Sequence, residues 1–159
     1  QLAKSFSPEE PDKLFGIMDE LAQITTQRVV EADGVVIKYI GDSALIVFDD
    51  QDIDAAVMAM YHLKAELEAC LAVKGFRNTV TFSLHLGETA IGYMGKEPFR
   101  WLDVIGDAVQ FTFVMLNRMS QRRFTITPQV FRKLKPETRK TFHKFTPPIV
   151  YLADKYPAE

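Results

Sequence analysis

Two short runs of apolar residues, separated by only three small or polar ones, constrain the fold of this chain more than any other feature. Residues 35–40 and 44–48 are rich in β-branched and aromatic side chains, which favour strands. Gly41-Asp42-Ser43 joins them, and glycine and aspartate dominate such tight loops because they tolerate the backbone angles required. The two runs therefore predict an antiparallel β-hairpin.

A helical pattern lies on each side of this hairpin. Before it, apolar residues recur at helical spacing up to about Glu31, and Ser7-Pro8-Glu9-Glu10 carries the capping residues that begin a helix. After it, a second helical pattern follows the acidic cluster at 49–52 and ends at Gly75, where a left-handed cap is expected. The apolar positions that define the two patterns are Leu14, Met18, Leu21, Val29, Ala55, Ala59, Leu63, Leu67 and Leu71.

The rest of the chain mixes strand and helix patterns. Strands are predicted at 79–86, 89–93, 100–105, 123–126 and 142–152, a turn at 95–98, and helices at 107–119 and after Thr127-Pro128. This order predicts an α+β sandwich of the ferredoxin-like kind, with helices on one face of a largely antiparallel sheet. The 159 residues, 47% hydrophobic and 25% charged, fit one globular domain.

Composition excludes several partners. A formal charge of −2 without long runs of like charge gives no footprint for nucleic acid or for an anionic membrane surface. The single cysteine, Cys70, forms no internal disulfide, which favours a reducing, cytoplasmic setting. No apolar stretch approaches the roughly 20 residues of a membrane span, and no signal peptide is evident. The start at Gln1 suggests the cytoplasmic piece of a longer, membrane-attached or multidomain protein.

Three residues stand out on chemical grounds. Asp103 lies in the apolar strand Trp-Leu-Asp-Val-Ile, where a carboxylate is costly to bury unless it is paired or faces a ligand; the alternative is the open face of the sheet. Asp42 at the hairpin tip could hold a divalent cation, or it could be plain turn chemistry. Lys38, four residues earlier, could reach a ligand or be simply solvated.

Histidine and glycine patterns point to no further chemistry. His85 stands between two leucines, as a core histidine does, and it shows no metal-ligand spacing with His62 or His143, so zinc is set aside. The chain contains neither a Gly-x-Ser-x-Gly nor a Walker pattern. The function must therefore be sought in the carboxylates and Lys38.

The motifs, taken in order, resemble a known family. Residues 34–48, GVVIKYIGDSALIVF, look like the core signature of class III adenylate and guanylate cyclases. His85-Leu-Gly87, Gly92-Tyr-Met-Gly95 and Asp103-Val-Ile-Gly-Asp-Ala-Val109 are similar to the later motifs of that family, at the expected spacing. The resemblance covers nearly all of residues 1–159, and it implies a single cyclase homology domain with the ferredoxin-like α+β fold.

The resemblance also implies a site and a substrate. In this family two protomers pair head to tail, and each nucleotide site, with two Mg²⁺ or Mn²⁺ ions, lies at their interface. Asp42 would be the second metal-binding aspartate, and the first is expected on a strand upstream of Gln1. Lys38 and Asp103 would read the base. Their chemistry fits adenine in ATP, because an ammonium can donate to N1 and a carboxylate can accept from the 6-amino group.

Several positions depart from the family pattern. The asparagine that stabilises the transition state falls at Gln110, the phosphate-binding arginine falls at Val114, and a second arginine of many members falls at Thr81. Arg118 lies one helical turn beyond Val114. Losing one such stabilising group typically lowers the rate on the order of a hundred- to a thousandfold.

The sequence therefore leaves three hypotheses. The first is an adenylate-cyclase-type domain, catalytically degenerate, that makes cyclic AMP and pyrophosphate as a homodimer or heterodimer. The second is a pseudo-cyclase, a regulatory or dimerisation module or a heterodimer partner without activity of its own. The third is an unrelated ferredoxin-like binding domain, although the charge of the chain and the absence of an aromatic nucleic-acid-binding signature weigh against RNA.

Overall fold

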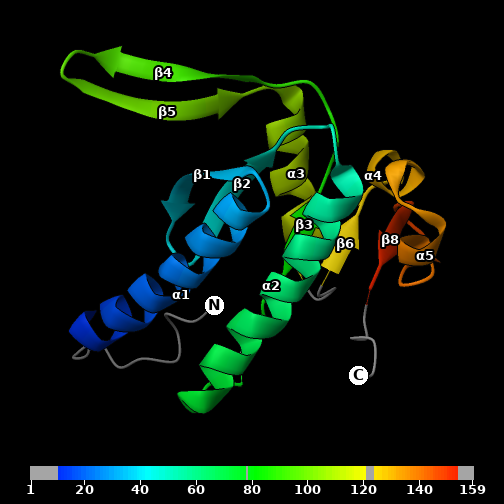
Figure 1. Cartoon of the computed structure of the whole chain (residues 1–159), viewed down its shortest axis with the longest axis horizontal. Helices are drawn as coiled ribbons and strands as arrows, with labels where there is room; N and C mark the ends of the chain where they lie inside the picture. The colour runs from blue at the N-terminus through cyan, green and yellow to red at the C-terminus, as the bar shows by residue number, and fades with distance from the viewer. Residues whose placement is uncertain (1–10, 78, 121–123, 154–159) are drawn as a thin grey trace.

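The computed structural model describes residues 11–77, 79–120 and 124–153 (Figure 1). Along the chain, the predicted hairpin follows one long helix and precedes another. Helix α1 spans Pro11–Glu31, strands β1 and β2 span Gly34–Ile40 and Ser43–Phe48, and helix α2 spans Ile53–Val73. These elements confirm the prediction, although the expected helix start at Ser7-Pro8 lies outside the described residues. The Asp52 carboxylate accepts from the Ala55 N–H and so caps α2.

The second sheet has four short strands in the order β3-β6-β8-β7. Strands β3 (Phe82–Leu84) and β6 (Phe124–Ile126) are parallel, while β8 (Val150–Leu152) pairs antiparallel with both β6 and β7 (His143–Phe145). The predicted strand at 79–86 is shorter in the structure, where β3 covers three residues that pair with β6. The predicted extended segment at 142–152 was wrong in one respect, since the chain reverses between β7 and β8.

Helices cover both faces of this four-stranded sheet. Phe124 and Ile126, which alternate along β6, belong to the core cluster that includes the buried residues of α2. Thr125 lies between these two residues of β6, so its side chain points to the opposite face of the sheet. On that face its partner Leu152 packs with Met115 of helix α3 (Asp107–Arg118). The α+β class is confirmed, and the structure adds α3 on the face opposite α2. That placement explains why all of β6 is buried.

Strands β4 (Ala90–Lys96) and β5 (Phe99–Ile105) form a third, separate sheet that extends away from the helices (Figure 1). Every residue of β4 is exposed. The turn was expected at 95–98, but β4 continues to Lys96 and pairs there with Phe99. The long arm meets the remainder of the molecule where β5 approaches β1.

The other connections complete the fold. Helix α4 (Pro128–Lys133) starts after Thr127 as predicted, and the short helix α5 (Pro136–Arg139) was not predicted. Among the described strands, β2 pairs only with β1, and β3 only with β6. The expectation of a further strand upstream of Gln1 stays a prediction. No helix among the described residues is long and apolar enough to cross a membrane.

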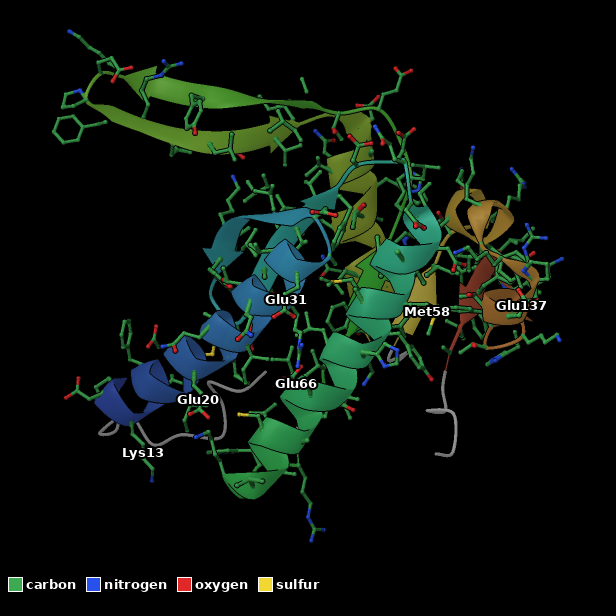
Figure 2. The ribbon with its side chains drawn as sticks, viewed as in Figure 1. Lys13, Glu20, Glu31, Met58, Glu66 and Glu137 are labelled. Atoms are coloured by element: carbon green, nitrogen blue, oxygen red, sulfur yellow. The ribbon has the colours of Figure 1, made fainter. Side chains whose placement is uncertain are left out.

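Polar side chains connect α1 and α2 at their surface. Glu31 of α1 and Glu66 of α2 lie between the two helices (Figure 2), and Arg28 binds both, with N···O distances of 2.8 Å and 2.7 Å. These side chains are substantially exposed, so each pair adds little to stability, on the order of 1 kcal/mol or less. The helix pair therefore owes its position mainly to the apolar core beneath it.

Candidate functional site

Lys38 and Asp103, 65 residues apart in the chain, form an ion pair where β1 meets β5. The Lys38 Nζ lies 2.7 Å from Oδ1 and 2.8 Å from Oδ2 of Asp103. The register of β1 on β2 shifts between Val36 and Lys38, which marks a β-bulge. A bulge breaks the alternation of side chains along a strand. Val36 can therefore pack on the core while Lys38 reaches β5.

The Asp103 carboxylate accepts two further hydrogen bonds. Besides Lys38, the Val104 N–H donates to Oδ1 at 2.8 Å, and the Trp101 indole N–H donates to Oδ2 at 3.3 Å. The Lys38 hydrogen bond, helped by these two donors, lowers the pKa of Asp103 below its ordinary value. Asp103 is thus an ionised acceptor at neutral pH, and its side chain is only 14% exposed.

Space remains beside this carboxylate. The residue opposite Asp103 on β4 is Gly92, and a Cβ added there would meet no heavy atom within 4 Å. Lys38 itself keeps 40% of its side chain exposed. A flat ligand can therefore approach both groups from solvent without displacing a side chain at Gly92.

Asp42 lies apart from this pair, at the exposed tip of the β1–β2 hairpin. It follows Lys38 by four positions, which corresponds to roughly 13 Å along an extended chain. Within the described part of the chain, no three His, Cys, Asp or Glu side chains come together as a metal site. The metal-binding role of Asp42 stays a prediction.

Helix α3 carries the positions at which catalytic groups were expected. Gln110, Val114 and Arg118 follow one another at four-residue intervals and are all exposed, so they share one face of the helix. Val114 is 47% exposed although it is apolar. Thr81, the other altered position, donates from its hydroxyl to the Ser120 carbonyl at 3.3 Å, just beyond α3.

Comparison with known proteins agrees with this architecture. No family model matches the sequence. An adenylate cyclase from Anabaena cylindrica is 28% identical over 108 residues, which are 63% of this chain and 22% of that protein. The chain thus spans about a fifth of that relative.

Solved structures resemble the chain over almost its full length. A bacterial light-regulated adenylyl cyclase superposes with a TM-score of 0.75 at 21% identity, over 98% of this chain and 49% of that one. The guanylyl cyclase Cya2 gives 0.68 at 17% identity, over 94% and 82%. The adenylyl cyclase CyaB from P. aeruginosa gives 0.70 at 12% identity, over 94% and 86%.

The chain has the fold of a class III nucleotidyl cyclase domain. Within this cyclase fold, the motif residues that the sequence singled out fall on neighbouring elements: Lys38 on β1, Asp103 on β5 and Gln110 on α3. The fold brings Lys38 and Asp103 together, whereas Asp42 lies at the tip of the β1–β2 hairpin and Gln110 on a separate helix.

One residue beside the Lys38–Asp103 pair was not singled out by the sequence analysis. Trp101 lies two residues before Asp103, hence on the same face of β5, and its N–H contacts the carboxylate. In an apolar strand a tryptophan is usually a core residue, yet Trp101 is 54% exposed. The i, i+2 spacing on a strand was the signal that could have found it.

His85 is half-buried in the cyclase fold and serves as a packing residue. Its Nδ1 lies 3.1 Å from the Thr127 hydroxyl, and its ring centre lies 4.5 Å from that of Phe111 on α3. Burial lowers the pKa of His85 below 6.5. The neutral imidazole therefore fits this position better than the charged one.

Acid is expected to destabilise the protein through His85. Because the pKa of His85 is lower in the folded state, the unfolded chain binds more protons, and the free energy of unfolding falls as the pH drops through the unfolded-state pKa of about 6.5. Thermal midpoints measured at about pH 7.5 and about pH 5.5 should differ more in the wild type than in His85→Gln. His62→Gln, at an exposed histidine of α2, is the control and should behave as the wild type. An equal drop in His85→Gln would contradict this assignment.

Proposed function

We propose that this chain is an adenylate-cyclase-type domain that binds ATP through Lys38 and Asp103. With Mg²⁺ or Mn²⁺, and at the interface of a homodimer or heterodimer, it would convert ATP to cyclic AMP and pyrophosphate. The observation that carries the proposal is the ion pair between Lys38 and Asp103, with both oxygens of the carboxylate within 2.8 Å of the ammonium. Similarity to an adenylate cyclase supports it.

Adenine fits the hydrogen-bonding character of the pair. The Lys38 ammonium is a donor and suits the N1 acceptor of adenine, while the ionised Asp103 is an acceptor and suits the 6-amino group. Guanine reverses both demands, since it offers an acceptor at O6 and a donor at N1. A buried polar group left without its partner is costly, so the pair should discriminate strongly against GTP.

Asp42 has the donor chemistry that a divalent cation in such a domain would need. Mg²⁺ prefers oxygen ligands and in nucleotide sites is usually held by one or two carboxylates together with substrate phosphates and water. The exposed carboxylate at the β1–β2 tip suits this role. A bound cation would supply positive charge against the phosphates. A second carboxylate ligand is expected from upstream of Gln1.

The α3 face favours a second candidate, a pseudo-cyclase that binds nucleotide without turning it over. Val114 offers no charge where a phosphate-binding arginine is expected, and Thr81 is engaged with the Ser120 carbonyl. Two such losses, each on the order of a hundred- to a thousandfold, would leave little turnover. Binding and turnover must therefore be measured separately.

Cyclic AMP formation from ATP with Mn²⁺ is the test of the proposal. We expect slow turnover that is lost in Lys38→Ala and kept in Lys96→Ala, which removes an exposed lysine at the end of β4. GTP should give less cyclic product than ATP. ATP binding without turnover would favour the pseudo-cyclase, and neither binding nor turnover by the folded protein would refute both candidates.

The β4–β5 arm supplies a surface on which two protomers could pair. On β5, Phe99 and Ile105 are 82% and 60% exposed, and large apolar side chains left open to solvent are typical of contact surfaces. We therefore place the dimer contact on the arm, in line with the dimer proposed above.

Phe99→Glu is expected to weaken self-association at least tenfold, because a charge would have to be buried in the contact. Sedimentation velocity over a range of protein concentrations measures the change. Phe15→Glu makes the same substitution at a residue that is 74% exposed on α1, and it should leave association unchanged. Equal effects of the two variants on self-association would contradict a dimer contact on the arm.

A further inference from the structure

Trp101 is held in a defined orientation although half of it is exposed. Its indole N–H donates to Asp103 Oδ2 at 3.3 Å. The other edge of the indole lies over Gly95, where an added Cβ would stand 2.8 Å from Trp101 Cζ3 and 2.5 Å from the Phe99 carbonyl oxygen. Gly95 also has a φ of +100°, which side chains rarely adopt. Glycine at this position therefore makes room for the ring.

The exposed ring adjoins the open space beside Asp103. Trp101 and Asp103 are on the same face of β5, and Asp103 faces Gly92 across the strand pair. Gly92 contributes no side chain to that face, and a Cβ there would meet nothing within 4 Å. The space is thus bordered by an aromatic ring, a carboxylate and the Lys38 ammonium.

These three groups match a flat heterocycle that has polar atoms on its edge. Ligand sites commonly combine apolar or aromatic walls with a few polar groups that fix orientation. An aromatic side chain packs on any base, because every base has a π face, whereas the edge carries the hydrogen-bonding pattern. The Lys38–Asp103 pair can read that edge, and an aromatic wall gives affinity that the charges alone do not.

We propose that Trp101 is a residue of the nucleotide site, packing its ring against the purine while its N–H positions the Asp103 carboxylate. The inference rests on the proposed function, in which Lys38 and Asp103 bind adenine. It assigns two separable effects to one side chain. The ring contributes affinity for any purine nucleotide, and the N–H contributes discrimination between ATP and GTP.

The chain contains a single tryptophan, so its fluorescence reports on this position alone. ATP titrated into the wild-type protein should change the emission of Trp101 with the same dissociation constant that calorimetry gives for ATP. Both signals should vanish in Lys38→Ala. Calorimetric binding of ATP without any change in emission would overturn the inference while leaving the proposed function intact. No binding in calorimetry would overturn both.

Two substitutions separate the ring from the N–H. Trp101→Leu should weaken binding of ATP and GTP about tenfold, since it removes the aromatic wall. Trp101→Phe keeps an aromatic ring without the N–H and should recover most of the affinity but lose part of the preference for ATP. Wild-type affinity and preference in both variants would overturn the inference.

Tyr93→Leu is the matched control for these variants. Tyr93 is an aromatic residue of the same arm and is 65% exposed, but it pairs with Leu102 and therefore points to the opposite face from Trp101. Nucleotide affinity should be unchanged in Tyr93→Leu. A change in Trp101 emission that followed protein concentration but not ATP concentration would overturn the inference.

Discussion

Asp103→Ala is expected to weaken ATP binding by about 100-fold. The carboxylate accepts from the Lys38 ammonium, the Val104 N–H and the Trp101 indole, and it is proposed to accept from the adenine 6-amino group. Alanine leaves all of these donors without their acceptor. Hydrogen bonds to charged groups are each worth about 1.5–3 kcal/mol, and the loss of one or two such bonds reaches 100-fold.

Calorimetric titration with ATP measures this loss, and thermal unfolding of the same variant shows whether the fold survives. Asp103→Asn refines the test because the carboxamide keeps the shape and one acceptor oxygen but adds a donor, which suits guanine O6. The preference for ATP over GTP should therefore fall more steeply than overall affinity. Unchanged ATP affinity in a folded Asp103→Ala variant would rule out this pair as the base-reading site.

The residues proposed to read the base and those at the positions expected to stabilise charge lie on different elements of the fold, so in this proposal one role can persist without the other. The ion pair depends on β1 and β5, whereas the altered positions Gln110 and Val114 lie on α3. Substitutions on α3 remove charge without disturbing the pair. We therefore expect the domain to bind ATP with measurable affinity while it turns ATP over slowly.

Local pattern predicted most elements of the fold. The β1–β2 hairpin and both long helices follow directly from residue periodicity and from the glycine and aspartate at the turns. Strand lengths in the second sheet were less predictable, because residues 79–81 are as strand-like as 82–84 but lie outside β3. The side of the sheet that α3 covers could not be predicted from local pattern either, since the contact between Met115 and Leu152 depends on tertiary packing.

The candidate site was predicted in its residues but not in its contacts. Asp103 was suspect because a carboxylate in an apolar strand needs a partner, and the structure supplies Lys38 as that partner. A bulge at Ile37 makes the contact possible, and no periodicity reveals a bulge in advance. Trp101 was missed because an aromatic residue in an apolar strand is taken for core.

Phe124→Ala is expected to lower the free energy of unfolding by about 3–5 kcal/mol, the largest effect on stability. Phe124 is 0% exposed and joins elements that are distant in sequence. Its ring centre lies 5.5 Å from that of Tyr61 on α2, 5.5 Å from that of Phe82 on β3 and 6.0 Å from that of Phe142. Alanine would leave a cavity among three aromatic rings, and their edge-to-face and stacked contacts would be lost together.

Chemical denaturation of the wild type and the variant measures the change. Phe15→Ala, at a phenylalanine that is 74% exposed, is the control and should stay within about 0.5 kcal/mol of the wild type. Phe124 packs in the core against α2 and β3 and is not a proposed ATP-binding residue. The folded fraction of the variant should therefore bind ATP with wild-type affinity. A loss below about 1 kcal/mol would mean that the three rings collapse into the space, and that Phe124 does not anchor the core.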